Sequence, residues 1–264
     1  MNYTNIDGVP NFNCYEYGDK NADYCLCIPI INEGERIKKE LQRAKKYGID
    51  SIVDIIICDG GSTDGCTDSE VLKSLGVNTL LIKKDIGKQG AQLRMGFWWA
   101  LKRGYKGIIT IDGNNKDSIE SVPLFIEKLE NGYDLIQGSR YIEGGQAINT
   151  PLIRHLSVKL IHSPIISLAA QYRFTDTTNA FRGYSRKYLE HKDTKPFRDI
   201  FVSYELLAYL SVRATQIGLK VCEVPVTRAY PKGEKTPTKI SPIKGNTDLM
   251  KILLKTLKGD YKPS

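Results

Sequence analysis

One segment of the chain joins an apolar strand directly to a loop of glycines and carboxylates. Residues 55–65 read Ile-Ile-Ile-Cys-Asp-Gly-Gly-Ser-Thr-Asp-Gly. In an open α/β sheet, ligands bind where strands end and loops diverge, and glycines let the backbone approach a polar ligand. Asp59, at the end of the predicted strand, can accept hydrogen bonds from a base or a ribose. The segment therefore indicates an α/β fold with a nucleotide site at a strand end.

A second predicted strand ends in the same manner. Residues 107–111 read Gly-Ile-Ile-Thr-Ile and lead into Asp112, Gly113 and Asn114. Carboxylate oxygens are typical ligands of Mg²⁺, which proteins usually bind together with the phosphates of a substrate. Two such strand ends predict a site for a nucleotide diphosphate.

Apolar strands alternate with amphipathic helices through the first half of the chain. Strands are predicted at 24–31, 52–58, 80–83 and 108–111, and helices at 32–47, 69–75 and 90–103. Such alternation is typical of a mostly parallel sheet flanked by helices. Further helices are predicted at 121–131, 150–172 and 204–216, strands at 134–138 and 220–226, and a loop leading into a strand at 175–185.

The chain divides into three segments. Residues 1–23 mix polar and aromatic residues without a clear period, so we expect an N-terminal extension that wraps the domain. Residues 24–230 form the α/β domain. Residues 231–264 form a basic tail with a short amphipathic segment at 248–258.

The net charge of +8 favours phosphate-bearing partners, although charge alone does not distinguish a nucleotide from an anionic membrane. Nucleic acid is not expected as a partner, because the basic residues are spread along the chain without a recognition helix. The polar N-terminus predicts no signal sequence, and no apolar run is long enough to cross a bilayer. We expect a cytoplasmic protein that can also contact the inner face of a membrane. The sequence leaves the oligomeric state open.

Several motifs occur in one order along residues 24–239. They are Ile-Pro-Ile-Ile-Asn-Glu (28–33), Asp-Gly-Gly-Ser-Thr-Asp-Gly (59–65), Asp-Gly-Asn (112–114), Gly-Ser-Arg-Tyr-Ile-Glu-Gly-Gly (138–145) and Thr-Asp-Thr-Thr-Asn-Ala-Phe-Arg-Gly-Tyr-Ser (175–185). With these motifs the chain resembles family-2 glycosyltransferases of the GT-A type, and among them the dolichyl- and polyprenyl-phosphate mannosyl- and glucosyltransferases. The resemblance implies a GT-A, Rossmann-like fold that binds a nucleotide-sugar donor.

The resemblance also assigns residues to the donor. It implies that Pro29, Glu33 and Asp59 line the base and ribose, with Gly61 in the same loop. A second interpretation of Glu33 is that it interacts with the N-terminus of the following helix, where a carboxylate is stabilised by the helix dipole.

The predicted metal site departs from the family pattern. Asp112 matches the first carboxylate of an Asp-x-Asp motif, which in the family holds a cation against the diphosphate. The second carboxylate is replaced by Asn114, and Lys116 stands where the polyprenyl-phosphate enzymes usually have glutamine. We therefore expect Mg²⁺ or Mn²⁺ to be held by Asp112 and Asn114 more weakly than usual. Lys116 would assist the cation or partly replace it at the diphosphate.

The predicted acceptor is a lipid phosphate. A phosphate monoester is already an anion and needs only cationic side chains to position it, whereas a sugar hydroxyl needs a general base. Arg140 and Arg154 match family positions that hold the acceptor phosphate, and arginine suits bidentate phosphate contact. The alternatives are that Arg140 pairs with a loop carboxylate and that Arg154 is a solvated helix residue.

Three further residues belong to the predicted acceptor side. Asp176 is the candidate base if the acceptor is a hydroxyl, or it orients Arg182 or the metal. Arg182 is expected to contact the acceptor. Glu205 is expected near the ligand, with a buried contact to the Arg182 loop as the alternative.

The basic segment after residue 227 corresponds to a family loop that closes over the donor diphosphate. Arg228, Lys232 and Lys235 are the candidates for phosphate contact, and a cationic lid would exclude water from the activated sugar. A solvated linker is the alternative for each lysine.

Together these residues predict an inverting glycosyltransferase that passes a sugar from a nucleotide-diphosphate donor to a polyprenyl phosphate. Contact with the membrane would come from residues 156–174 and the basic tail. Transfer to a hydroxyl of a surface glycan is the second hypothesis. A non-catalytic module that binds nucleotide sugars is the third, suggested by Asn114.

Overall fold

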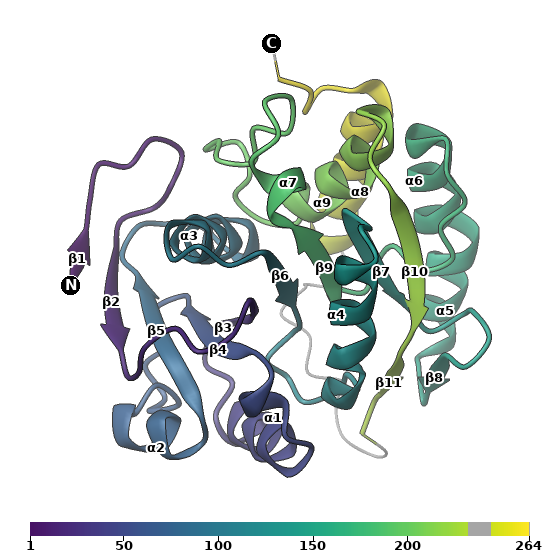
Figure 1. Cartoon of the computed structure of the whole chain (residues 1–264). Coiled ribbons are helices and arrows are strands. Elements are labelled where there is room, and N and C mark those ends of the chain that lie inside the picture. Colours follow the sequence, from purple (N-terminus) through teal and green to yellow (C-terminus); the bar gives the residue numbers. More distant parts are fainter. Residues whose placement is uncertain (232–243, 264) are drawn as a thin grey trace.

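Within the described residues, 1–231 and 244–263 of the computed structural model, nine strands form a central sheet (Figure 1). Their order is β1-β2-β5-β4-β3-β6-β9-β7-β10. The strands are β1 (Asn2–Tyr3), β2 (Phe12–Glu16), β3 (Tyr24–Ile30), β4 (Asp54–Asp59), β5 (Val77–Lys83), β6 (Gly107–Thr110), β7 (Leu135–Ser139), β9 (Arg182–Ser185) and β10 (Val221–Pro225). The strands β8 (Gln146–Ile148) and β11 (Thr227–Ala229) pair in parallel as a separate small sheet.

Most strands of the central sheet run in one direction. β5, β4, β3 and β6 are parallel neighbours, and β7 pairs in parallel with β10. β9 is antiparallel to both β6 and β7, and β2 is antiparallel to β5. The predicted mostly parallel sheet flanked by helices is confirmed. The strand predicted within 175–185 is also present as β9, but its antiparallel direction was not predicted.

Helices cover both faces of the sheet (Figure 1). They are α1 (Glu35–Lys46), α2 (Ser69–Ser74), α3 (Gln89–Lys102), α4 (Val122–Glu130), α5 (Leu152–Ser157), α6 (Ser163–Ala170), α7 (Arg186–Leu189), α8 (Glu205–Gln216) and α9 (Lys244–Lys258). Because successive side chains of a strand point to opposite faces, β3 contributes to two cores. Leu26 and Ile28 pack with residues of α1, α2 and α4, whereas Cys25 and Cys27 pack with residues of α3 and α8.

Residues 1–23 add β1 and β2 to the edge of the central sheet beside β5. Phe12 is completely buried, and its ring stacks on Tyr3 with the ring centres 4.9 Å apart. The ring of Trp98 on α3 lies edge-on to both. The N-terminal segment is therefore integrated into the sheet and into the core beneath α3.

The carboxyl ends of β4, β3 and β6 lie side by side, because these strands are parallel neighbours. Here and below, this row of strand ends is the edge of the sheet that is meant. Asp59 is the last residue of β4, and Asp112 follows the end of β6 by two residues. Adjacent strands lie about 4.8 Å apart, and β3 separates β4 from β6, so the two strand ends lie roughly 10 Å apart. The two sequence motifs therefore meet at the same edge.

A helical segment with a π-helical turn follows the small sheet. α5, the π-helical turn η3 (Val158–His162) and α6 succeed one another without a break, and α6 packs against α8 and α9. In the part of the chain that the structure describes, no helix has both the length and the apolar character needed to span a bilayer.

Candidate active site

Asp59 organises the loop that follows β4. Its carboxylate is almost completely buried and accepts hydrogen bonds from Gly61 N at 2.8 Å, from Ser62 N at 2.9 Å and from Ser62 Oγ. Gly61 has a φ of 97°, a left-handed conformation that favours glycine. A carboxylate has about four acceptor positions, so Asp59 can shape this loop and still accept a hydrogen bond from a ligand.

The loop after β3 is tied to the loop after β4. Asn32 N donates to Ser62 Oγ at 2.8 Å, and Thr63 N donates to Asn32 Oδ1 at 2.8 Å. Gly34 N donates to Asp64 Oδ2, also at 2.8 Å. These contacts fix the two predicted donor loops relative to each other. Neither Asn32 nor Ser62 is among the residues predicted for the site, although asparagine and serine commonly bind backbone groups in turns.

The remaining predicted donor residues lie on or next to β3. Pro29 is half-buried in the strand, paired in register with Cys58 of β4. Glu33 forms an ion pair with Arg36 of α1, with Glu33 Oε2 and Arg36 Nε 2.9 Å apart. The structure thus places Pro29, Glu33 and Asp59 on neighbouring strand ends.

Asp112 is held by two donors from different parts of the chain. Gln89 Nε2, at the start of α3, donates to Asp112 Oδ1 at 3.0 Å, and Arg228 Nη2 donates to Asp112 Oδ2 at 3.1 Å. Asn114 Nδ2 is 3.5 Å from the same Oδ2. Asn114 Oδ1 is buried and has no hydrogen-bond partner in the described part of the chain. A buried amide oxygen without a partner, on a side chain whose Nδ2 faces a carboxylate, can serve as a cation ligand when the amide turns over.

Three cationic side chains surround the ring of Tyr230. Lys116 Nζ lies 5.1 Å from the ring centre, Arg154 Cζ 5.6 Å and Arg228 Cζ 5.9 Å. Arg154 Nη1 also donates a hydrogen bond to Tyr230 Oη at 2.8 Å. We call Lys116, Arg154, Arg228 and Tyr230 the Tyr230 cluster. It brings three predicted phosphate-binding residues together beside Asp112, around a tyrosine that was not among the predicted site residues.

Burial and the close spacing of the charged groups shift two pKa values in the Tyr230 cluster. Burial and the neighbouring Arg228 lower the pKa of Lys116. Burial alone would raise the pKa of Tyr230, but Arg228 and Arg154 outweigh it and the net shift is downward. Concentrated positive charge of this kind attracts an anion such as a phosphate.

Arg140 and Asp176 form a buried ion pair. Arg140 Nε donates to Asp176 Oδ2 at 2.6 Å, and Arg140 Nη2 donates to Asp176 Oδ1 at 2.8 Å. Their side chains are 2% and 0% exposed. Arg140 therefore pairs with a loop carboxylate, which was the alternative interpretation of this residue. The proposed contacts of both residues with the acceptor stay predictions.

Arg182 and Glu205 have other partners than the Tyr230 cluster in this structure. The guanidinium of Arg182 is buried, and it donates to the carbonyl oxygens of Thr177, Asn179 and Leu207. It thereby braces the loop before β9 against α8. Glu205 accepts a hydrogen bond from Ser203 N at the start of α8. Their contact with an acceptor stays a prediction.

The predicted lid lies only partly within the described residues. Arg228 is fixed in β11, whereas Lys232 and Lys235 lie outside the residues that the structure describes.

Asp117 is a site residue that was not predicted from the sequence. Burial raises its pKa to about 6, and it forms an ion pair with Arg228. The carboxylate is close to the Asp-Gly-Asn motif in sequence, but its arginine partner lies 111 residues further along the chain.

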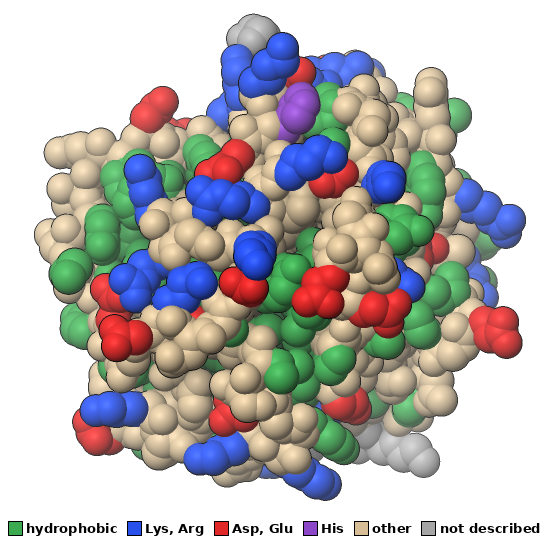
Figure 2. All heavy atoms as spheres, viewed as in Figure 1, with side chains coloured by type: hydrophobic (Ala, Val, Ile, Leu, Met, Phe, Trp, Pro, Cys, Tyr) green, Lys and Arg blue, Asp and Glu red, His purple; other side chains and the backbone are tan. Residues whose placement is uncertain are grey.

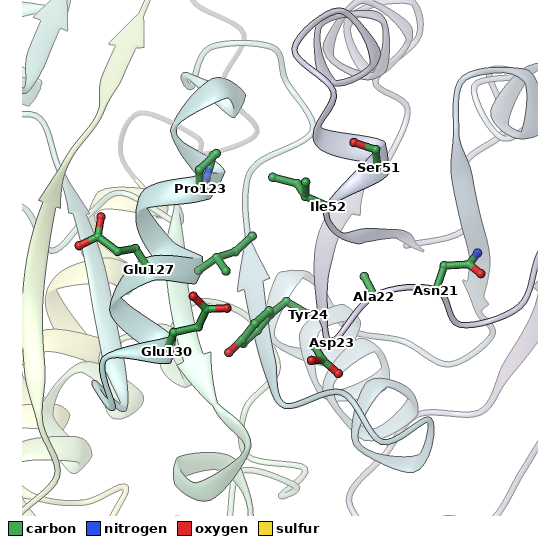
Figure 3. Close-up of a pocket in the computed structure, with 10 residues that line it drawn as sticks. Asn21, Ala22, Asp23, Tyr24, Ser51, Ile52, Pro123, Glu127 and Glu130 are labelled. Carbon is green, nitrogen blue, oxygen red and sulfur yellow. The ribbon is translucent and has the colours of Figure 1, made fainter.

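A surface hollow lies at the other end of the sheet (Figure 3). It is lined by Asn21, Ala22, Asp23, Tyr24, Ser51, Ile52, Pro123, Ile126, Glu127 and Glu130. Tyr24 is the first residue of β3, so this hollow lies at the amino ends of the parallel strands, opposite Asp59. It is not the predicted donor site.

On the described residues of the face in Figure 2, lysines and arginines are interspersed with acidic side chains rather than gathered in one stripe.

The α/β fold, with two carboxylate-bearing strand ends at one sheet edge, is typical of proteins that bind a nucleotide at the carboxyl ends of their strands. A family model described as "Glycosyl transferase family 2" matches residues 25–192, and the chain belongs to this family. The predicted family and the assignment as a glycosyltransferase are confirmed.

Two curated relatives resemble most of the chain. An undecaprenyl-phosphate mannosyltransferase of Micrococcus luteus is 27% identical over 203 residues, which cover 76% of this chain and 81% of the relative. A polyprenol monophosphomannose synthase of Mycolicibacterium smegmatis is 28% identical over 205 residues, which cover 76% of each chain.

Solved structures share the fold. The glucosyl-3-phosphoglycerate synthase of Mycobacterium tuberculosis, in complex with Mn²⁺, uridine diphosphate and glucosyl-3-phosphoglycerate, has a TM-score of 0.62 at 14% identity. The similarity covers 91% of this chain and 81% of that one. The predicted GT-A fold is confirmed.

Proposed function

We propose that this chain transfers a sugar, with inversion, from a nucleotide-diphosphate sugar to a polyprenyl phosphate. The observation that carries the proposal is the Tyr230 cluster, which gathers Lys116, Arg154 and Arg228 beside Asp112. Arg154 belongs to α5, where an exposed apolar segment begins. A phosphate site next to an exposed apolar helix suits a lipid phosphate.

The donor is placed at the carboxyl ends of β3, β4 and β6. Pro29, Glu33 and the Asp59 loop would hold the nucleoside, because they lie on neighbouring strand ends at this edge. Lys116 and Arg228 would contact the diphosphate. Cationic groups at this position stabilise the charge that develops on the leaving nucleotide.

Asp112 and Asn114 would hold a divalent cation, Mg²⁺ or Mn²⁺. Asn114 Oδ1 is buried without a hydrogen-bond partner in the described part of the chain, and the Asp112 side chain is 24% exposed. Among residues 1–231 and 244–263, no three His, Cys, Asp or Glu side chains converge as a metal site. The remaining ligands would therefore be donor phosphates and water, as is usual for Mg²⁺. When bound, the cation supplies charge neutralisation at the diphosphate.

The acceptor is inferred from the state of the carboxylates. Asp176 would be the base for a hydroxyl acceptor, but both of its oxygens already accept hydrogen bonds from Arg140. Asp112 and Asp117 are both paired with Arg228. A lipid phosphate is ionised before it binds and needs no base, so it fits these charges better than a sugar hydroxyl.

A membrane surface is the proposed source of the acceptor. Leu152, Ile153, Leu156, Leu160 and Leu168 are exposed along α5, η3 and α6. Leu152, Leu156 and Leu160 recur at intervals of four residues, so they lie on successive turns of the same helical side. On the adjacent α9, Leu254 and Leu257 are also exposed. A helical face of this kind can lie in the interface of a bilayer.

Radiolabelled donors separate this proposal from its rival. The purified protein is incubated with Mn²⁺, a panel of labelled nucleotide sugars, and either polyprenyl phosphate or a glycan acceptor. Label recovered in the lipid fraction, and lost in Asp112→Ala, supports the proposal. Label recovered only in the glycan would assign the protein to hydroxyl transfer, and the absence of transfer or hydrolysis with every donor would indicate a binding module.

A further inference from the structure

Arg228 is shared between two carboxylates, and the proposed function uses only one of them. Arg228 Nη2 donates to Asp112 Oδ2 at 3.1 Å, and Arg228 Nη1 donates to Asp117 Oδ2. Arg228 is 7% exposed and Asp117 is fully buried. The proposed cation ligand, Asp112, therefore already has a positively charged partner from its own chain.

We propose that Arg228 is a resident counter-ion of Asp112 that competes with the divalent cation, and that Asp117 retains Arg228 when Asp112 changes partner. This inference rests on the proposed cation site at Asp112 and Asn114. It makes Asp117 a positioning residue, because it acts through Arg228.

The backbone of β11 restricts how Arg228 can move. Ala229 N donates to Lys116 O at 2.8 Å, and Ser118 N donates to Thr227 O at 2.9 Å. Arg228 and Asp117 also pair as an isolated antiparallel bridge. The α-carbon of Arg228 is thus fixed beside Asp117, and only its side chain can rotate away from Asp112.

Asp117 has the capacity to hold the guanidinium by itself. Its Oδ1 atom is buried and has no hydrogen-bond partner within residues 1–231 and 244–263. A guanidinium presents its N–H groups as a fork that fits both oxygens of one carboxylate. When Arg228 releases Asp112, it can form a second hydrogen bond to Asp117, which replaces the one it loses.

The exchange leaves each charge with a suitable partner. Asp112 is the more exposed of the two carboxylates, with 24% of its side chain accessible against 0% for Asp117. Asp112 can therefore face the cation and the diphosphate while Asp117 stays behind Arg228. Arg228 remains within the Tyr230 cluster, close to the same diphosphate.

Binding of Mn²⁺ alone tests this exchange without a donor or an acceptor. Free Mn²⁺ is measured by electron paramagnetic resonance during titration of the wild type, Arg228→Gln and Asp117→Asn. Lys106→Gln is the matched control, because it removes one positive charge from an exposed ion pair with Asp23 at the opposite end of β6. Thermal unfolding establishes that each variant is folded, and Arg228→Lys replaces Arg228→Gln if the latter does not fold.

The two variants should shift Mn²⁺ affinity in opposite directions. Without Arg228, Asp112 loses its hydrogen-bonded guanidinium, and Mn²⁺ should bind about tenfold more tightly, since a hydrogen bond to a charged group contributes about this factor. In Asp117→Asn, Arg228 has only one carboxylate left, and Mn²⁺ should bind about tenfold more weakly. Arg228→Lys should give an intermediate affinity, and Lys106→Gln should match the wild type.

A merely structural ion pair predicts a different pattern. Shifts of the same sign in both variants, unchanged affinities, or no detectable Mn²⁺ binding in any of the proteins would overturn the inference. Because no sugar donor or acceptor is present, such a result would leave the proposed transfer to polyprenyl phosphate open to its own assay.

Discussion

Replacing Leu160 and Leu168 together with serine should release the protein from lipid vesicles. Each side chain is 69% exposed, and full burial of a leucine is favourable by about 2 kcal/mol. Covering the exposed part of each leucine would therefore contribute about 1.4 kcal/mol, and the pair about 2.8 kcal/mol. The double variant should bind vesicles roughly a hundredfold more weakly.

Cosedimentation with sucrose-loaded vesicles of phosphatidylethanolamine and phosphatidylglycerol measures this effect. Ile52→Ser serves as the control, because Ile52 is 40% exposed in the hollow at the opposite end of the sheet. Circular dichroism checks that α6 is intact in the double variant. If the double variant binds vesicles as well as the wild type does, the α5 to α6 surface does not contact the membrane and this reasoning is wrong.

Three other predictions follow from single contacts. Arg154→Gln should raise KM for polyprenyl phosphate about tenfold and leave KM for the donor unchanged, because Arg154 is assigned to the acceptor phosphate. Steady-state kinetics with each substrate varied in turn measures both constants. A change in the donor KM instead would refute this assignment. Burial lowers the pKa of His162 below its usual 6.5. Below pH 6.5 the unfolded chain therefore binds a proton at this imidazole more readily than the folded chain does, and the free energy of unfolding should fall as the pH drops. Urea unfolding should show a smaller decline in His162→Gln. Gly96→Ala places a methyl group 2.5 Å from Cys58 Sγ and should destabilise the fold by about 1–3 kcal/mol. Because Cys58→Ala removes the sulfur atom, adding it should restore part of the lost stability in thermal unfolding. If the double variant shows no recovery, the steric explanation is wrong.

Local sequence patterns were sufficient to predict much of the architecture. The alternation of apolar strands and amphipathic helices predicts β3 to β6 and the helices between them, because each element has its own period. The strand-end motifs at Asp59 and Asp112 also predict a shared edge, since parallel neighbours end on the same side. These inferences depend only on short segments and on a general property of α/β sheets.

The remaining features depend on contacts between distant segments. The antiparallel strand β2 comes from a polar, aperiodic stretch whose strand character depends on pairing with β5. The ion pair of Arg140 with Asp176 joins residues 36 positions apart, and that of Arg228 with Asp117 joins residues 111 positions apart. A motif identifies the residue that carries charge, but the fold decides which partner reaches it. For this reason the Tyr230 cluster could not be assembled from sequence alone.

The central claim is that the strand ends at Asp59 and Asp112 form one site for a nucleotide diphosphate. Calorimetric titration of adenosine, cytidine, guanosine, thymidine and uridine diphosphate, with Mn²⁺ present, tests it in the wild type, Asp59→Asn and Lys116→Gln. At least one of these nucleotides should bind the wild type, and substitution of Asp59 or of Lys116, which follows the Asp112 strand end, should weaken that same binding about tenfold or more. Binding of none of the nucleotides, or binding that responds to only one of the two substitutions, would contradict the claim.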